Sequence, residues 1–112
     1  MPTLQLGSHQ VGNCEPTYII AEIGINHQGE VEIAKKLIQE AADAGANAVK
    51  FQKRSIKRIL THEGLEMPYD NRNSFGKTYG EHKKALELSE DNYQELLSFA
   101  TEHKVDFIAS GW

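Results

Sequence analysis

The chain contains a single cysteine, Cys14, among its 112 residues. One cysteine cannot form a disulfide within the chain, whereas small secreted domains commonly rely on several. The sequence therefore predicts a reducing compartment, and we expect a cytoplasmic protein. Cys14 could act as a nucleophile, although an inert thiol in an N-terminal loop is the simpler interpretation.

Long apolar runs, a surplus of basic residues and nucleotide-binding fingerprints are also missing. No run approaches the roughly 20 apolar residues of a membrane span, and the N-terminus lacks the charged-then-apolar order of a signal peptide. The 16 acidic residues outnumber the 12 basic ones, and the basic residues form no stripe. Neither G-x-G-x-x-G nor G-x-x-x-x-G-K-[ST] occurs. We therefore expect neither a membrane nor a nucleic acid as a partner.

Predicted strands and helices alternate along the chain. Apolar runs at residues 18–23, 48–52 and 105–109 predict strands, the first of them buried on both faces. Helical spacing of apolar residues predicts one helix over residues 31–43 and another after Ser89, a favourable N-cap. The apolar stripe of the second helix comprises Tyr93, Leu96, Leu97 and Ala100. This order is typical of the opening of a parallel α/β fold.

We expect these elements to open a domain that is larger than the chain. A closed (β/α)8 barrel takes about 250 residues, and three βα units cannot close one. We therefore expect residues 17–112 to be the N-terminal portion of a TIM-barrel domain inside which the chain ends. Weak alternation of apolar residues predicts a short β-hairpin or an extended arm over residues 1–16.

A long segment over residues 55–88 separates the second strand from the second helix. It is polar and rich in turns, with one short helix expected near residues 56–60, and connections of this length are commonly functional. We expect it to fold over the mouth of the barrel as a partly ordered lid. Its expected anchors are Tyr69, Phe75 and Tyr79. The alternative is a surface excursion that packs on a partner subunit.

Polar side chains occupy the C-terminal ends of the first two predicted strands. Side chains alternate between the faces of a strand, so Glu22, Lys50 and Gln52 share one face if Ile23 and Phe51 pack on the helices. Active sites of parallel α/β folds lie at this edge of the sheet. A lysine there needs an anionic neighbour, which could be a ligand's phosphate or carboxylate, or Glu22 itself. Glu22 could orient hydroxyls, act as an acid or base, or only balance Lys50.

Further candidates lie at strand ends and in the loops that follow them. Asn26 and His27 belong to the loop after the first strand, where such folds place binding residues. His27 could be a base, a hydrogen-bond donor or a metal ligand. No second histidine stands at metal-binding spacing, so we expect no metal site made from this chain alone. Ser110 could bond a bound anion or be an ordinary strand-end serine. We expect the basic side chains of residues 53–58 to be solvated, with phosphate binding as the alternative.

Four motifs together resemble one known family. They are Ala21-Glu22-Ile23-Gly24-x-Asn26-His27-x-Gly29, Ala44-Gly45-Ala46-x-Ala48-Val49-Lys50-Phe51-Gln52, Gly76-Lys77-Thr78-Tyr79-Gly80-Glu81-His82-Lys83 and Ala109-Ser110-Gly111-Trp112. The chain from Tyr18 onward resembles the N-terminal barrel half of the sialic acid (N-acetylneuraminate) synthase family. That resemblance implies an enzyme of carbohydrate biosynthesis on a TIM-barrel fold.

The resemblance also implies a reaction. Phosphoenolpyruvate condenses with open-chain N-acetylmannosamine, or with its 6-phosphate, to give a nonulosonic acid and phosphate. Glu22 and Lys50 are the implied catalytic residues, with Lys50 on the phosphate or carboxylate of phosphoenolpyruvate. Substrate-binding roles fall to Asn26, His27, Gln52 and Ser110.

Other parts of the enzyme are expected outside the chain. The family uses a divalent metal, Mn²⁺ or Mg²⁺, whose ligands come from later strands, so the fragment alone should be inactive. A homodimer is expected for the full-length protein. The alternatives are another phosphoenolpyruvate-dependent sugar-acid synthase, a barrel aldolase, or a non-catalytic degenerate fragment.

Overall fold

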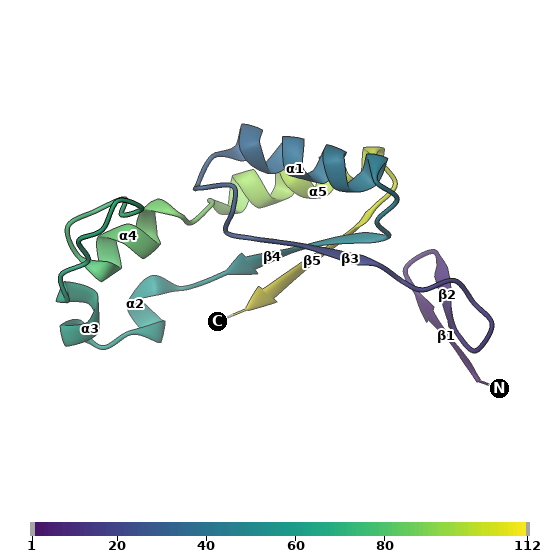
Figure 1. Cartoon of the computed structure of the whole chain (residues 1–112), viewed down its shortest axis with the longest axis horizontal. Helices are drawn as coiled ribbons and strands as arrows, with labels where there is room; N and C mark the ends of the chain where they lie inside the picture. Colours follow the sequence, from purple (N-terminus) through teal and green to yellow (C-terminus); the bar gives the residue numbers. More distant parts are fainter. Residues whose placement is uncertain (1, 112) are drawn as a thin grey trace.

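The computed structural model describes residues 2–111, and Met1 and Trp112, the last residue of the fourth motif, lie outside the described residues. Figure 1 shows a separate N-terminal hairpin, a body of sheet and long helices, and a group of short helices. In chain order the elements are β1 (Thr3–Leu6), β2 (His9–Gly12), β3 (Ile20–Gly24), α1 (Val31–Asp43), β4 (Ala48–Lys53), α2 (Ile56–Ile59), α3 (His62–Glu66), α4 (Tyr79–Ala85), α5 (Glu90–Glu102) and β5 (Asp106–Gly111).

The body is a parallel sheet in the order β3-β4-β5. Both α1 and α5 lie on the same side of this sheet and contact each other (Figure 1). Each connection therefore returns over one face, as right-handed crossovers require. The predicted α/β fold, with its strand order and its two helices on one side, is confirmed.

The core fills the space between the two helices and the sheet. Ile38 of α1, Val49 and Phe51 of β4 and Leu96 of α5 are all 0% exposed. Helix α1 ends where Ala46 N–H bonds to Ala41 C=O, a closure that requires the positive φ of +92° at Gly45. Burial of the apolar stripe of each helix against the sheet thus stabilises the packing of α1 and α5 on β3, β4 and β5.

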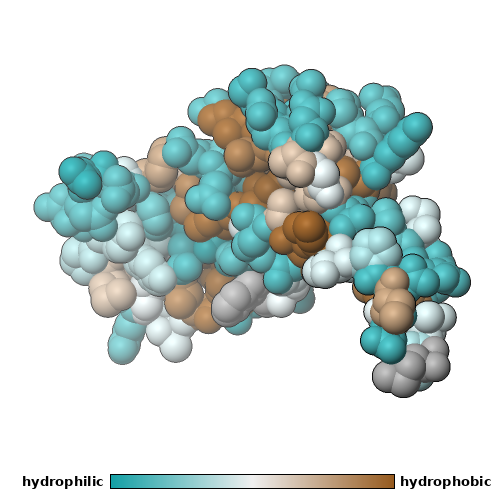
Figure 2. Space-filling view, turned by 45° about the vertical axis from the view of Figure 1, so that its right-hand side comes forward, coloured by the Kyte–Doolittle hydropathy of each residue, from teal (hydrophilic) through white to brown (hydrophobic). Residues whose placement is uncertain are grey.

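Two expectations about burial were wrong. Strand β3 is not buried on both faces, because Ile20 on the face away from the helices is 47% exposed. Three strands with helices on one side cover only that side within residues 2–111. Leu97 is also 47% exposed, because it lies about 100° around α5 from the buried Leu96. Figure 2 shows apolar surface in the middle of the molecule between polar regions.

The segment after β4 contains more regular structure than the sequence predicted. Its expected short helix is α2, but α3 and α4 were missed. Both start at threonine N-caps, Thr61 and Thr78, and Thr78 forms a capping box with Glu81. Figure 1 places these helices beyond the C-terminal end of β4, at the opposite end of the molecule from the hairpin.

The N-terminal hairpin pairs β1 with β2 in antiparallel register. Tyr18, just after it, donates a hydrogen bond of 2.6 Å from its hydroxyl to Asp106 Oδ2 at the start of β5. Burial, followed by this bond, raises the pKa of Tyr18 to about 12. No helix among the described residues has the length and apolarity needed to cross a bilayer.

Candidate active site

The Glu22 and Lys50 side chains form an ion pair on the face of the sheet away from the helices. Lys50 Nζ lies 3.0 Å from Glu22 Oε2, because the parallel register places the two residues side by side. Their side chains are 35% and 50% exposed, so both remain open to a ligand. In that setting the pair adds little to stability, since solvent screens it.

Gln52 joins this pair around Gly24. A methyl group on Gly24 would lie 3.4 Å from Glu22 Oε1 and 3.7 Å from Gln52 Nε2, so both side chains surround the glycine. Ser110 stands beside Gln52 in the register of β4 with β5. The structure thus brings Glu22, Lys50 and Gln52 to one face, as strand parity predicted, and places Ser110 beside Gln52 on the neighbouring strand.

The Asn26 side chain forms its hydrogen bond within its own loop, and no hydrogen bond joins it to Glu22, Lys50 or Gln52 among the described residues. Its side-chain Nδ2 donates to Ile23 C=O at 2.9 Å, which closes the turn after β3. The residue is exposed. The amide oxygen of Asn26 accepts no hydrogen bond within the described part of the chain.

His27 does not join the other predicted residues. It is 1% exposed, and its ring stacks on Phe51, on the helix-covered side of the sheet, with centroids 5.8 Å apart. Its Nδ1 accepts from Gly29 N–H at 2.9 Å, while Nε2 has no hydrogen-bond partner in the structure of residues 2–111. Burial lowers the pKa of His27. Its placement suits a neutral ring that shapes the loop.

Arg54 and Glu87 form a buried ion pair that the sequence analysis missed. Arg54 Nε lies 2.6 Å from Glu87 Oε1, and Arg54 is 6% exposed. The same carboxylate accepts from the Arg54 backbone N–H at 3.2 Å. The expectation that this basic segment is solvated was therefore wrong for Arg54, because the chain folds Glu87 back onto the end of β4.

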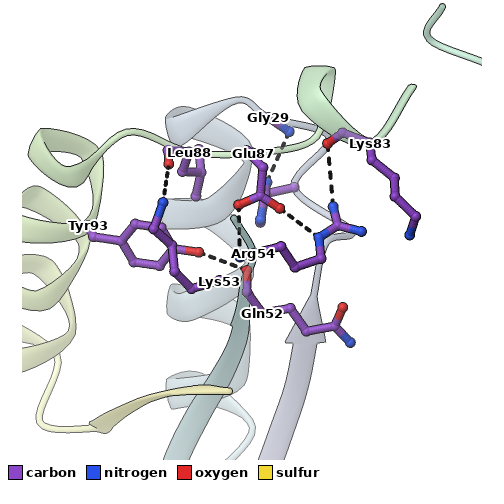
Figure 3. Close-up of polar contacts among 9 residues, drawn as sticks. Gly29, Gln52, Lys53, Arg54, Lys83, Glu87, Leu88 and Tyr93 are labelled. Atoms are coloured by element: carbon purple, nitrogen blue, oxygen red, sulfur yellow. Dashed lines mark hydrogen bonds and ion pairs between the residues drawn. The ribbon is translucent and has the colours of Figure 1, made fainter. Parts of the chain in front are cut away.

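Further contacts hold the linker between α4 and α5 against the end of β4 (Figure 3). Lys53 Nζ donates to Leu88 C=O at 3.5 Å, and Tyr93 Oη donates to Gln52 C=O at 2.9 Å. Burial raises the pKa of Tyr93 to about 12. Gly29 packs against the end of α4 so closely that a methyl group there would lie 2.2 Å from the carbonyl oxygen of Ala85. The backbone beside the predicted site is thus fixed from several directions.

A hollow opens next to Gln52, between the end of β4 and helices α2 and α4. Its volume is about 420 Å³, within the range of small-molecule sites. The lining residues are Gln52, Arg54, Ile59, Leu60, Tyr79 and Lys83. The Lys83 ammonium lies 4.7 Å from the centroid of the Tyr79 ring.

The described residues do not fit a divalent metal. Over residues 2–111 no group of three or more His, Cys, Asp and Glu side chains is placed to hold one. The carboxylate nearest the site, Glu22, already faces the Lys50 ammonium at 3.0 Å. We derive no chemical step through a metal at these residues.

An ion pair, an amide and a hydroxyl lie at the C-terminal edge of the parallel sheet, the edge at which enzymes of the parallel (β/α) class place their active sites. The sequence places the chain within that class. Residues 37–112 match the NeuB family, and the chain belongs to this family. The resemblance stated from the motifs is thereby confirmed.

Two relatives with similar sequences support the same family. The chain is 50% identical over 101 residues to an N-acetylneuraminate-9-phosphate synthase of Mus musculus and 48% identical to that of Homo sapiens. Each alignment covers 90% of this chain and 28% of the relative, so the chain spans little more than a quarter of the relatives' length.

A solved structure shows the same fold. It is an N-acetylneuraminic acid synthetase from Leptospira borgpetersenii serovar Hardjo-bovis in complex with citrate, superposed with a TM-score of 0.73 at 29% identity. The match covers 99% of this chain and 34% of that one.

Proposed function

We propose that the chain is part of a sialic acid synthase that condenses phosphoenolpyruvate with N-acetylmannosamine or its 6-phosphate. The observation that carries the proposal is the solvent-open Glu22–Lys50 pair at the C-terminal edge of the sheet, in a chain of the NeuB family. The three βα units are then the first part of a (β/α)8 barrel over residues 17–112, with the hairpin ahead of it.

The reaction forms one carbon–carbon bond and releases phosphate. C3 of phosphoenolpyruvate attacks the aldehyde carbon of the sugar, water adds at C2, and the tetrahedral intermediate loses phosphate as its C2–O bond breaks. Lys50 binds the phosphate or carboxylate of phosphoenolpyruvate through a charge-assisted hydrogen bond. Glu22 and Gln52 bind hydroxyls of the amino sugar.

The remaining predicted residues support this arrangement. Ser110, beside Gln52, donates its hydroxyl to the bound anion, and the Asn26 amide contacts substrate from the first loop. His27 acts as a positioning residue, since its ring packs on Phe51 on the helix-covered face of the sheet and accepts a hydrogen bond from Gly29 of the same loop. The Mn²⁺ or Mg²⁺ that the resemblance implies would supply Lewis-acid activation of the aldehyde, with ligands from outside this chain.

The names of the relatives indicate whether their sugar substrate is phosphorylated. In the condensation, three carbons of phosphoenolpyruvate precede C1 of the sugar, so the sugar's C6 becomes C9 of the product. The similar mouse and human proteins are named for a 9-phosphate product, which corresponds to a 6-phosphate sugar. We further propose a homodimer in the cytoplasm, with the lone Cys14 in keeping with a reducing compartment.

The test is phosphate release by the complete gene product. We expect release from phosphoenolpyruvate only when N-acetylmannosamine, its 6-phosphate or a related amino sugar is present, with a nonulosonic acid detected by mass spectrometry. A barrel aldolase would instead join pyruvate to the sugar and release no phosphate. Phosphate release that ignores the sugar, or the absence of a nine-carbon product, would contradict the proposal.

A further inference from the structure

The hollow beside Gln52 continues from the face that carries Glu22 and Lys50. Gln52 lies near Glu22 across Gly24 and also lines the hollow. A substrate whose reacting end lies at the sheet edge can therefore extend its far end toward α4. In Figure 3 the Lys83 side chain lies beside the Arg54 guanidinium, and the Gln52 side chain extends below the Arg54–Glu87 pair.

The hollow carries positive charge, and one of its two cations has no ion-pair partner within residues 2–111. Its lining contains two cations, one amide and, among the described residues, no carboxylate. The Arg54 guanidinium is neutralised by Glu87 at 2.6 Å. Lys83 belongs to none of the ion pairs within residues 2–111, and its ammonium has only the face of Tyr79 beside it at 4.7 Å.

The other acidic side chain nearby is turned away from Lys83. Glu81 of α4 accepts from the backbone N–H groups of Lys77 at 2.8 Å and Thr78 at 3.3 Å, at the other end of the helix. An anion that enters the hollow therefore meets the Lys83 ammonium without a competing carboxylate.

The position of Lys83 is set by the structure around it. Arg54 Nη2 donates to Lys83 C=O at 3.5 Å, and Arg54 follows Gln52 by two residues on the same chain segment. The buried ion pair thus holds the backbone of Lys83 close to the end of β4. When Lys83 binds an anion, its flexible side chain therefore loses only its own rotamer freedom, because the backbone is already held in place.

We propose that Lys83 is a specificity-determining residue that binds the distal phosphate of a phosphorylated amino sugar. The identity of this ligand rests on the proposed synthase function. The reacting aldehyde lies at the Glu22 and Lys50 end, Gln52 binds the middle of the open chain, and the phosphate monoester meets Lys83 in the hollow. Phosphoenolpyruvate carries the other phosphate of the reaction, so the test separates the two.

The experiment is calorimetric titration of the complete gene product with N-acetylmannosamine 6-phosphate, N-acetylmannosamine and phosphoenolpyruvate, each alone. We expect Lys83→Gln to weaken binding of the sugar phosphate by about 10- to 100-fold, the range for one charge-assisted hydrogen bond. Binding of the unphosphorylated sugar and of phosphoenolpyruvate should not change. Lys83→Arg should retain most of the affinity for the sugar phosphate.

Lys84→Gln is the matched control, because Lys84 is exposed on the same helix and does not line this hollow. It should leave all three affinities unchanged. Circular dichroism melting curves of both variants show whether the protein remains folded, and the Lys83→Arg variant tests the charge if the glutamine variant does not fold.

Three results would overturn the inference: no change in Lys83→Gln, an equal loss for the unphosphorylated sugar, or a loss confined to phosphoenolpyruvate. The proposed function fails separately. A wild-type protein that binds the sugar phosphate through Lys83 but releases no phosphate from phosphoenolpyruvate would contradict the synthase and leave the phosphate subsite supported.

Discussion

Arg54 and Glu87 illustrate how much one residue pair controls at the end of β4. Their side chains are 4% and 13% exposed, and Arg54 also bonds to Lys83 C=O. Taking two charges out of water is costly, and the contacts between them offset that cost only while both partners are present. Removing one partner leaves an unpaired buried charge.

We therefore expect Glu87→Gln to lower the free energy of unfolding by about 3–5 kcal/mol. The matched control is Glu40→Gln, which breaks the Lys36–Glu40 pair on α1, where both side chains are at least 66% exposed. Solvent screening limits its cost to about 0.5 kcal/mol. Urea unfolding followed by circular dichroism gives both values, and equal losses in the two variants would contradict the buried-pair account.

Lys50 should act on phosphoenolpyruvate. Lys50→Ala removes a charge-assisted hydrogen bond worth about 1.5–3 kcal/mol, so kcat/KM for phosphoenolpyruvate should fall by about 10- to 100-fold. Steady-state kinetics of the complete gene product measures this. Glu22→Gln keeps the shape and removes the charge, and its main effect should be on the sugar and on the pH dependence. Unchanged kinetics in a folded Lys50→Ala variant would exclude the assignment.

His27 should make stability depend on pH. Burial lowers its pKa below the ordinary 6.5, so the folded protein keeps the ring neutral while the unfolded chain takes up a proton. Stability is full above pH 6.5 and is lost as the pH falls toward the lowered value. We expect the wild type to lose more stability between pH 7.5 and 5 than His27→Gln does.

His82→Gln is the comparison variant for this pH effect, and a smaller change is expected from it. Burial also lowers the pKa of His82, so its removal should weaken the dependence too, but His82 is less buried than His27. Urea titrations at the two pH values compare the three proteins. A wild type and a His27→Gln variant with identical pH dependence would show that this ring does not titrate with folding.

At the scale of elements, the start of α5 supports the wall of the site. Ser89 Oγ accepts from Asn92 N–H at 3.1 Å, and Asn92 Oδ1 accepts from Ser89 N–H at 3.2 Å. One turn later, Tyr93 bonds to the backbone of Gln52. The cap therefore orients the helix turn that touches β4.

Ser89→Ala should lower the free energy of unfolding by about 1 kcal/mol, the usual cost of losing an N-cap side chain. Ser98→Ala provides the same chemical change at an exposed position inside α5 and should raise stability by about 0.5 kcal/mol, because alanine is the better helix former. Thermal unfolding measures both. Changes of the same sign in the two variants would contradict the capping role.

At the scale of the whole molecule, residues 55–88 extend past the C-terminal edge of the sheet (Figure 1). Tyr69, Tyr79 and His82 pack there, with Tyr69 5.4 Å from Tyr79 and 4.3 Å from His82 between ring centroids. Phe75, the third expected anchor, is 49% exposed. A cluster of this kind can stay together while the segment moves toward a ligand.

We expect hydrogen exchange in residues 55–88 of the complete gene product to slow when phosphoenolpyruvate and the amino sugar are added together. Ligand contact with a lid excludes water from its backbone amides. The control is a dilution series without ligand. Protection that follows protein concentration and ignores ligand would identify the segment as a subunit contact instead.

Much of the fold and part of the site followed from the sequence. The period-2 alternation of β3 and β4 predicted that Glu22, Lys50 and Gln52 share a face, and the 3.6-residue spacing predicted α1 and α5. These features depend on neighbours within a few residues, which the sequence displays directly.

Other features depend on how distant segments meet, and only the tertiary structure decided them. Arg54 is buried because Glu87, 33 residues later, folds back onto β4. His27 lies on the helix-covered face of the sheet because its loop turns the ring onto Phe51. Whether a charged or aromatic side chain is buried depends on which distant residues fold around it. The same side chain is well solvated in water when those partners are absent, so local sequence does not reveal its burial.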